Sequence, residues 1–316
     1  MSTALRIKLI ATAPILLLVT FGAFIMVNLA PGDPTVNILG DNASPDDYIA
    51  MRQELGLDDP LFARYLSWLG NVFQGNFGTT LVPPQQEVAT VLARAIPVNL
   101  ELAVLTLLMA LAIAIPVGMW SAYRPGSRFD RAVSTTSFAL LSIPNFLLAV
   151  LLVLLLAVNW QVFPIGGWAR PTEEGWGANL YHAFLPALAL AIEESLVFAR
   201  LLRSDMHTTL QEDFIVASRA KGMPTWHVLV REALRPSSFS VLTLTGISVG
   251  RIIGGTFVIE QVFALPGLGQ AIVNGALTHD YRIVQGGVVV VAVVYLVISI
   301  VVDALYGYLD PRTRHA

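Results

Sequence analysis

The sequence predicts an all-α integral membrane protein with six transmembrane helices and an external folded segment between the first two. Hydrophobic residues make up 55% of the 316 residues, charged residues make up 13%, and the mean hydropathy is +0.67. Soluble domains do not have such a composition. Crossing about 30 Å of hydrocarbon takes about 20 apolar residues. Six stretches qualify: about Leu9 to Leu29, Val98 to Trp120, Val133 to Val158, Ala183 to Leu202, Ser240 to Val262 and Ile283 to Leu309.

The Lys and Arg residues between these stretches predict the orientation. With the N-terminus in the cytosol, the inner segments hold thirteen of these residues and the outer segments hold five, while Arg251 lies within the fifth span. Cytoplasmic loops retain positive charge near span ends, so both termini are expected to be cytosolic. The first span follows Arg6 and Lys8 and is longer than the core of a cleavable signal peptide. We interpret it as a retained anchor.

The outer segment at 30–97 is too charged to enter lipid and is expected to fold on the external face. Ser44-Pro45-Asp46-Asp47 has the residues of a helix start, so a helix is predicted from Pro45 to Leu55, ending before Gly56. An amphipathic pattern predicts a second helix from Leu61 to Phe73. This helix would lie at the membrane interface or pack on the helical bundle.

The sequence argues against several functions. It has two lysines and no G-x-x-x-x-G-K-[ST] motif, so it does not hydrolyse ATP by P-loop machinery. Without cysteines it has no disulfides and no thiolate metal sites, and its five histidines form no zinc motif. A net charge of -3 argues against nucleic acid as a partner. A membrane-embedded enzyme is also disfavoured, because no G-x-S-x-G motif is present.

The inner connection from Arg203 to Pro236 is much longer than most helix-to-helix connections, which favours a functional element. Two short helices are predicted in it, from Phe214 to Ala220 and from Thr225 to Leu234, with Gly222 ending the first and Thr225 capping the second. Their apolar side would dock on a partner while basic residues set the register. The alternative is a basic loop that only fixes topology or contacts anionic lipid.

Three charges fall inside predicted spans: Glu193 and Glu194 in the fourth and Arg251 in the fifth. Each isolated charge would be costly there, so these residues need partners. Glu193 and Arg251 both lie roughly 15 to 17 Å below the outer end of their span, at about 1.5 Å per residue, which permits a salt bridge. They would either line a translocation path, meeting the charged termini of a peptide, or lock two helices together.

Two further acidic residues, Glu101 and Glu260, fall near the outer ends of predicted spans. At that depth a carboxylate can be solvated or can extend towards the headgroup layer. We therefore expect Glu101 and Glu260 to have packing or interface roles.

The segment Ala217–Gly222 resembles the inner loop of ATP-binding-cassette importer permeases, in the variant of the dipeptide, oligopeptide and nickel permeases, first-permease type. Further motifs of that family occur in order along nearly the whole chain. They are Leu29-Ala30-Pro31-Gly32-Asp33-Pro34, Leu55-Gly56-Leu57-Asp58-Asp59-Pro60, Arg64-Tyr65, Gly75-Asn76-Phe77-Gly78, Leu141-Ser142-Ile143-Pro144, Phe163-Pro164-Ile165-Gly166-Gly167, Glu260 with Phe263, Pro266-Gly267-Leu268-Gly269, Asp280-Tyr281 and the block from Asp303 to Arg312.

The resemblance implies a pore-forming subunit without catalysis in a bacterial or archaeal inner membrane. Its partners would be a second, distinct permease chain, two nucleotide-binding subunits, an external solute-binding protein and membrane lipid. No cofactor would be bound by this chain, since ATP and Mg would be used by the partner subunits. The ATPase-coupling residues implied by the resemblance are Ala217, Arg219, Ala220, Lys221 and Gly222.

These expectations divide the chain into an N-terminus with the first span at 1–29, the external segment at 30–97, a permease core at 98–309 with a coupling loop at 203–238, and a tail at 310–316. Peptides are the expected substrates, with nickel chelates, glutathione or another small solute as alternatives. A secondary transporter driven by an ion gradient is the competing class, and it would use the same intramembrane charges.

Overall fold

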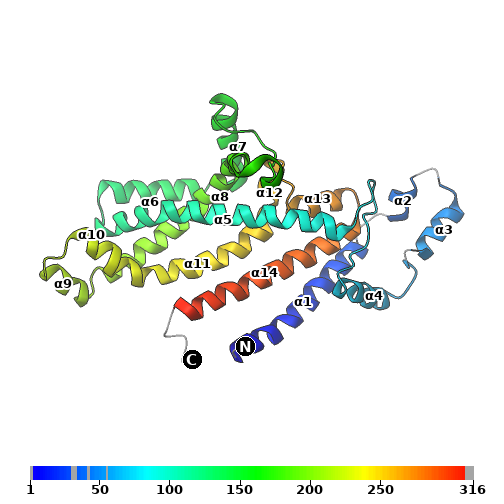
Figure 1. Ribbon diagram of the computed structural model, residues 1–316, viewed down its shortest axis with the longest axis horizontal. Coiled ribbons are helices and arrows are strands. Elements are labelled where there is room, and N and C mark those ends of the chain that lie inside the picture. The colour runs from blue at the N-terminus through cyan, green and yellow to red at the C-terminus, as the bar shows by residue number, and fades with distance from the viewer. Residues whose placement is uncertain (1–2, 30–33, 41–42, 55, 310–316) are drawn as a thin grey trace. The chain divides into compact units, whose positions relative to one another are not determined.

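The computed structural model describes residues 3–29, 34–40, 43–54 and 56–309, which are almost entirely helical (Figure 1). The tail at 310–316 and the motif residues 30–33 lie outside this part, as does the side chain of Asp303. The helices are α1 (Thr3–Leu29), α2 (Pro34–Leu39), α3 (Pro45–Glu54), α4 (Leu61–Phe73), α5 (Val88–Tyr123), α6 (Arg128–Leu141), α7 (Asn145–Leu152), η1 (Val153–Asn159), α8 (Pro171–Thr209), α9 (Asp213–Ala220), α10 (Thr225–His227), η2 (Val228–Ala233), α11 (Leu234–Gly255), α12 (Phe257–Val262), α13 (Leu268–Leu277) and α14 (Tyr281–Leu309).

The chain forms two compact units, each assembled from segments distant in sequence. Unit 1 comprises Met1–Asn99, Gly254–Glu260 and Pro266–Val301, whereas unit 2 comprises Leu100–Ile253, Gln261–Leu265 and Val302–Ala316. Unit 1 therefore holds α2, α3 and α4, which the sequence predicts to be external, together with α1 and most of α14. Unit 2 holds Glu193, Glu194, Arg251 and the long loop at 203–238.

Three helices among the described residues are long and apolar enough to cross a membrane, and a bent pair makes up to four. The three are α5, the continuous run Thr225–Gly255, and Tyr281–Val302. A multi-pass protein is therefore supported. The predicted third span is not one straight helix, because α6 and the run Asn145–Asn159 meet at 101°. Pro144 explains the break, since the residue before a proline is driven out of helical geometry.

The second predicted helix of the inner loop begins at Thr225, as expected, but it does not end at Leu234. It continues without interruption to Gly255 and includes the π-helical stretch η2. Pro236 lies just beyond that stretch and cannot donate to the carbonyl four residues earlier. A wider π-turn accommodates such a missing bond, so the helix persists. The predicted cap at Thr225 is also wrong, because Pro224 precedes the helix and no side chain caps it.

The external helices form close to where the sequence predicts them, with α3 ending at Glu54 and α4 spanning Leu61–Phe73. At the start of α3 the amide of Asp47 donates to Ser44 Oγ (3.3 Å), and the amide of Ser44 donates to Asp47 Oδ2 (3.0 Å). Hydrogen bonds from the Ser44 side chain and backbone lower the pKa of Asp47. These reciprocal bonds satisfy two amides at the helix start.

Helix α4 packs on α1 through one buried tyrosine. The Tyr65 hydroxyl lies 2.9 Å from Thr20 Oγ1, and its ring makes edge contacts with Phe21 and Phe24. The packing alternative for α4 is therefore present in unit 1. Helix α5 begins at Val88, ten residues before the predicted second span, and its first turns pack Val88 and Leu92 into a core with Leu268.

Candidate functional site

The inner loop presents a short helix that ends in a sharp turn. Helix α9 ends with Lys221 as its C-cap, and Gly222 follows with φ of 77°. The amide of Gly222 donates to the carbonyl of Arg219 (2.9 Å), and the amide of Met223 donates to that of Ser218 (3.3 Å). This bonding pattern is a Schellman motif, in which glycine is favoured because the left-handed conformation costs it little. The predicted end of this helix at Gly222 is confirmed.

The two sides of α9 differ in exposure. Ile215 and Ser218 are buried against unit 2, whereas all five residues predicted to couple to an ATPase are exposed. The apolar side chains of Phe214, Val216 and Trp226 are 45%, 58% and 65% exposed. Exposed apolar side chains flanked by Arg219 and Lys221 are the composition of a docking surface, with an apolar centre and a charged rim.

The end of α8 is tied to the first turn of α6 by an ion pair in which the carboxylate is buried. Arg203 Nε and Nη2 donate to the two carboxylate oxygens of Asp130 at 2.5 and 2.8 Å. Asp130 also accepts from the amide of Gly126 (2.8 Å). The hydrogen bonds to Asp130 raise the pKa of Arg203. A bidentate pair with a buried carboxylate fixes geometry strongly, so the base of the inner loop is held firmly.

The structure brings together the three charges that fall inside predicted spans, as their similar estimated depth permits. Arg251 on α11 donates from Nη2 to Glu194 Oε1 (2.5 Å), and its Nη1 lies 3.5 Å from Glu193 Oε1. Ser248 Oγ also donates to Glu194 Oε2 (2.8 Å). The side chain of Glu194 is 6% exposed, whereas those of Glu193 and Arg251 are 34% and 54% exposed. Glu194 is therefore the buried counter-ion, and Arg251 and Glu193 face outward from this chain.

A buried carboxylate in unit 1 was not singled out as a site by the sequence reasoning. Glu260 on α12 is fully buried, so of the two expected roles it has the packing role and not the interface role. Its Oε1 accepts from Asn99 Nδ2 and Thr256 Oγ1, both at 2.7 Å, and its Oε2 accepts from the amide of Gln270 at 2.7 Å. Three hydrogen bonds replace the water that this carboxylate loses.

Asn99 and Glu260 together cap the start of α13. Asn99 Oδ1 accepts from the amide of Leu268 (2.8 Å), and Glu260 accepts from Gln270, so two first-turn amides of this helix are satisfied. A Cβ on Gly267 would lie 2.4 Å from Glu260 Cδ. The sequence feature that could have indicated this site is the motif Pro266-Gly267-Leu268-Gly269, because its glycines permit the backbone to lie close to the Glu260 side chain.

Comparisons with known proteins decide the family. Residues 114–315 match the family model "Binding-protein-dependent transport system inner membrane component", and residues 1–103 match the N-terminal model of the same membrane component. The chain belongs to this family. The resemblance stated from the sequence motifs is thereby confirmed, and so is the assignment as a permease subunit and not an enzyme.

Curated relatives match this inner membrane component over almost their whole length. An oligopeptide transport system permease protein of Bacillus subtilis, AppB, is 36% identical over 98% of both chains. The dipeptide permease protein DppB of the same organism is 33% identical over 96% of this chain and 95% of the relative. A putative peptide transport system permease protein of Brucella melitensis is 37% identical over the full length of both.

A solved structure of the MetNI methionine ABC transporter, described as inward facing, shares the fold. One of its chains aligns with a TM-score of 0.57 at 20% identity, covering 70% of this chain and 96% of that one. At this level of identity the likeness concerns the fold alone. The family name places this component in the inner membrane as a multi-pass protein that works with a binding protein and ATPase partners.

Proposed function

We propose that this chain is the permease subunit of an ATP-driven importer of peptides. The observation that carries the proposal is the full-length similarity to permeases named for oligopeptide and dipeptide transport, at 36% and 33% identity. The inner loop supports it, since α9 offers an exposed apolar and basic surface to a cytosolic partner. ATP and Mg would act in the partner subunits, and this chain would convert their motion into alternating access.

The proposed topology has six spans, with both termini in the cytosol and the segment at 30–97 outside. The charge asymmetry of the connections supports this orientation. The permease core at 98–309 would pair with a second, distinct permease chain, and a solute-binding protein would deliver substrate to the outer face. The movement of the nucleotide-binding subunits would reach this chain through its coupling loop at 203–238. The residues proposed to transmit it are Ala217, Arg219, Ala220, Lys221 and Gly222.

The test is uptake by the assembled importer in proteoliposomes. We expect peptide accumulation that requires ATP, is blocked by vanadate and depends on the binding protein. Uptake driven by an ion gradient through this chain alone would instead establish a secondary transporter. ATP-driven import of a nickel chelate or glutathione without peptide import would retain the ABC permease assignment and overturn the peptide substrate.

The cluster of Arg251, Glu193 and Glu194 is proposed to line the translocation path. The outward exposure of Arg251 and Glu193 supports this role, since a purely structural pair has no need of an accessible guanidinium. Arg251→Gln is expected to leave Glu194 buried without its cation, which costs roughly 3–5 kcal/mol. The double variant Arg251→Gln/Glu194→Gln should recover much of that stability, because the buried carboxylate is then neutral. Glu193 also loses its cation, but its side chain is partly exposed to solvent.

Uptake distinguishes a path role from a structural one. We expect the double variant to assemble with its partners and to import peptide at least tenfold more slowly than wild type. Arg128→Gln is the matched control, since Arg128 is an exposed arginine on the inner side of unit 2 and lies outside this cluster. Wild-type uptake by a well-assembled double variant would show that the charges only join two helices.

A further inference from the structure

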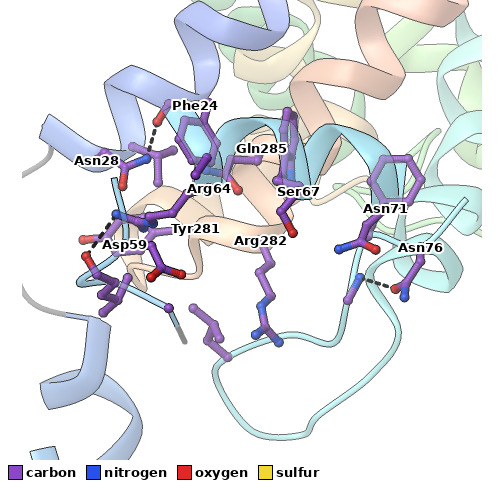
Figure 2. A pocket seen from close by; sticks show the side chains of 18 of the residues that line it. Phe24, Asn28, Asp59, Arg64, Ser67, Asn71, Asn76, Tyr281, Arg282 and Gln285 are labelled. Carbon is purple, nitrogen blue, oxygen red and sulfur yellow. Dashed lines mark hydrogen bonds between the residues drawn. The ribbon is translucent and has the colours of Figure 1, made fainter. Parts of the chain in front are cut away.

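Unit 1 contains a pocket of about 1020 Å³. Its lining includes neither the proposed coupling residues nor Glu193, Glu194 and Arg251. Its walls come from α1, α3, α4, the connection between α3 and α4, the loop after α4, and the first turns of α14 (Figure 2). Small-molecule pockets usually measure about 300–1,000 Å³, so this one has room for a short peptide.

The lining is rich in hydrogen-bond donors. Three arginines, Arg52, Arg64 and Arg282, face it against a single carboxylate, Asp59. Side-chain amides, which donate and accept, come from Asn28, Asn71, Asn76 and Gln285. Such amides match the alternating donors and acceptors of a peptide backbone. The excess of guanidinium groups favours an anionic group on the occupant.

Two of these arginines have no carboxylate partner among the residues that the structure describes. Arg64 donates from Nη1 to the carbonyl of Leu57 at a long 3.4 Å, and its guanidinium lies 5.9 Å from the centre of the Phe24 ring. Arg282 donates from Nη1 to the carbonyl of Thr79 (3.1 Å). Neither takes part in an ion pair there, whereas Arg52 pairs with Asp58 at 3.3 Å.

Partial burial sharpens the preference of Arg64 for an anion. The side chain is half-buried on α4, and this burial lowers the pKa of Arg64 below its ordinary value. The loss of hydration therefore outweighs the attraction of the nearby carboxylates Asp59 and Asp58, neither of which forms an ion pair with Arg64. A carboxylate placed beside it would restore that interaction through charge-assisted hydrogen bonds.

We propose that this pocket binds a short peptide by its carboxylate end, with Arg64 and Arg282 as the carboxylate-binding residues. The inference rests on the proposed function, because it takes the substrate to be a peptide and the pocket to open on the outer face. The amides then bind the peptide backbone, and Phe24, Trp68 and Phe77 offer apolar surface to its side chains. The pocket is a receiving site for substrate before it enters the membrane.

The test measures binding to the assembled importer in lipid nanodiscs, without its binding protein. Trialanine and its C-terminal amide are compared by equilibrium dialysis. We expect wild type to bind trialanine at least tenfold more tightly than the amide. The variant Arg64→Gln/Arg282→Gln should raise the Kd of trialanine at least tenfold, or about 1.4 kcal/mol, and leave that of the amide unchanged. Arg64→Lys keeps the charge but loses the planar guanidinium, so its Kd for trialanine should lie between those of wild type and the double variant.

Arg170→Gln is the matched control, because Arg170 is an exposed arginine outside the pocket, paired with Glu173 at 3.0 Å, and its loss should leave both Kd values unchanged. Equal Kd values for trialanine and its amide, or an unchanged Kd in the double variant, would overturn the proposal. Absence of peptide uptake by wild type would overturn the proposed function itself, whereas uptake with a carboxylate-blind pocket would overturn only this inference.

Discussion

Gly222→Val is expected to abolish productive coupling while leaving the protein folded. Gly222 has φ of 77°, and a Cβ there would meet no atom within 4 Å, so the effect is conformational and not steric. A side chain in this region costs roughly 1–2 kcal/mol, and a β-branched one costs more. The Schellman turn would open and α9 would change direction. We expect ATP-driven uptake to fall at least tenfold in proteoliposomes, with ATP hydrolysis no longer stimulated by the loaded binding protein.

Two further variants separate strain from coupling. Gly40→Val introduces the same strain, at φ of 74° and also with no atom within 4 Å, but on the external segment. Its uptake should stay near wild type. Gly222→Asn should retain much of the uptake, because asparagine tolerates the left-handed region better than valine. Wild-type uptake by Gly222→Val would contradict the proposed coupling role of this turn.

Local chemistry explains which elements the sequence could predict. The helices at 45–54 and 61–73 and the turn at Gly222 depend on caps, prolines and glycines within a few residues, and they form where expected. Helix breaks inside apolar runs were missed, because hydropathy alone does not register them. The chain bends at Pro144, whereas the helix continues through Pro236 with a π-helical stretch before it. Whether a proline breaks a transmembrane helix depends on the neighbouring groups that can satisfy the freed backbone, and the sequence does not show these groups.

The sites divide in the same way. Counting residues from span ends placed Arg251 beside Glu193 and Glu194, since helical rise is regular. It did not indicate that Glu194 is the buried member, because burial depends on which face each helix presents. The Asn99–Glu260 contact joins residues 161 positions apart, and the sequence around neither residue predicts it. Such pairings require the folded arrangement of α5, α12 and α13.

Glu260→Ala is expected to destabilise the protein strongly. It leaves two donors without an acceptor, Thr256 Oγ1 and the amide of Gln270, while Asn99 Nδ2 retains only its bond to Thr256 Oγ1 (3.1 Å). Each buried, unsatisfied donor costs about 1–3 kcal/mol, so the total should reach about 2 kcal/mol or more. In detergent, the thermal unfolding midpoint should fall by about 5–10 °C. Glu173→Ala, at an exposed carboxylate, should leave the midpoint unchanged, and an equal fall in both variants would contradict the anchoring role of Glu260.

A double-mutant cycle tests the contact between Glu260 and the glycine loop directly. Gly267→Ala should destabilise wild type, because its Cβ would lie 2.4 Å from Glu260 Cδ, but it should cost much less in the Glu260→Ala background, where that carboxylate is gone. Gly269→Ala is the matched control. Its Cβ would lie 2.8 Å from Phe257 Cα, a contact that the removal of Glu260 does not relieve, and 3.1 Å from Glu260 Oε2, so most of its penalty should persist in both backgrounds. Equal behaviour of the two glycine variants would show that Glu260 does not determine the path of this loop.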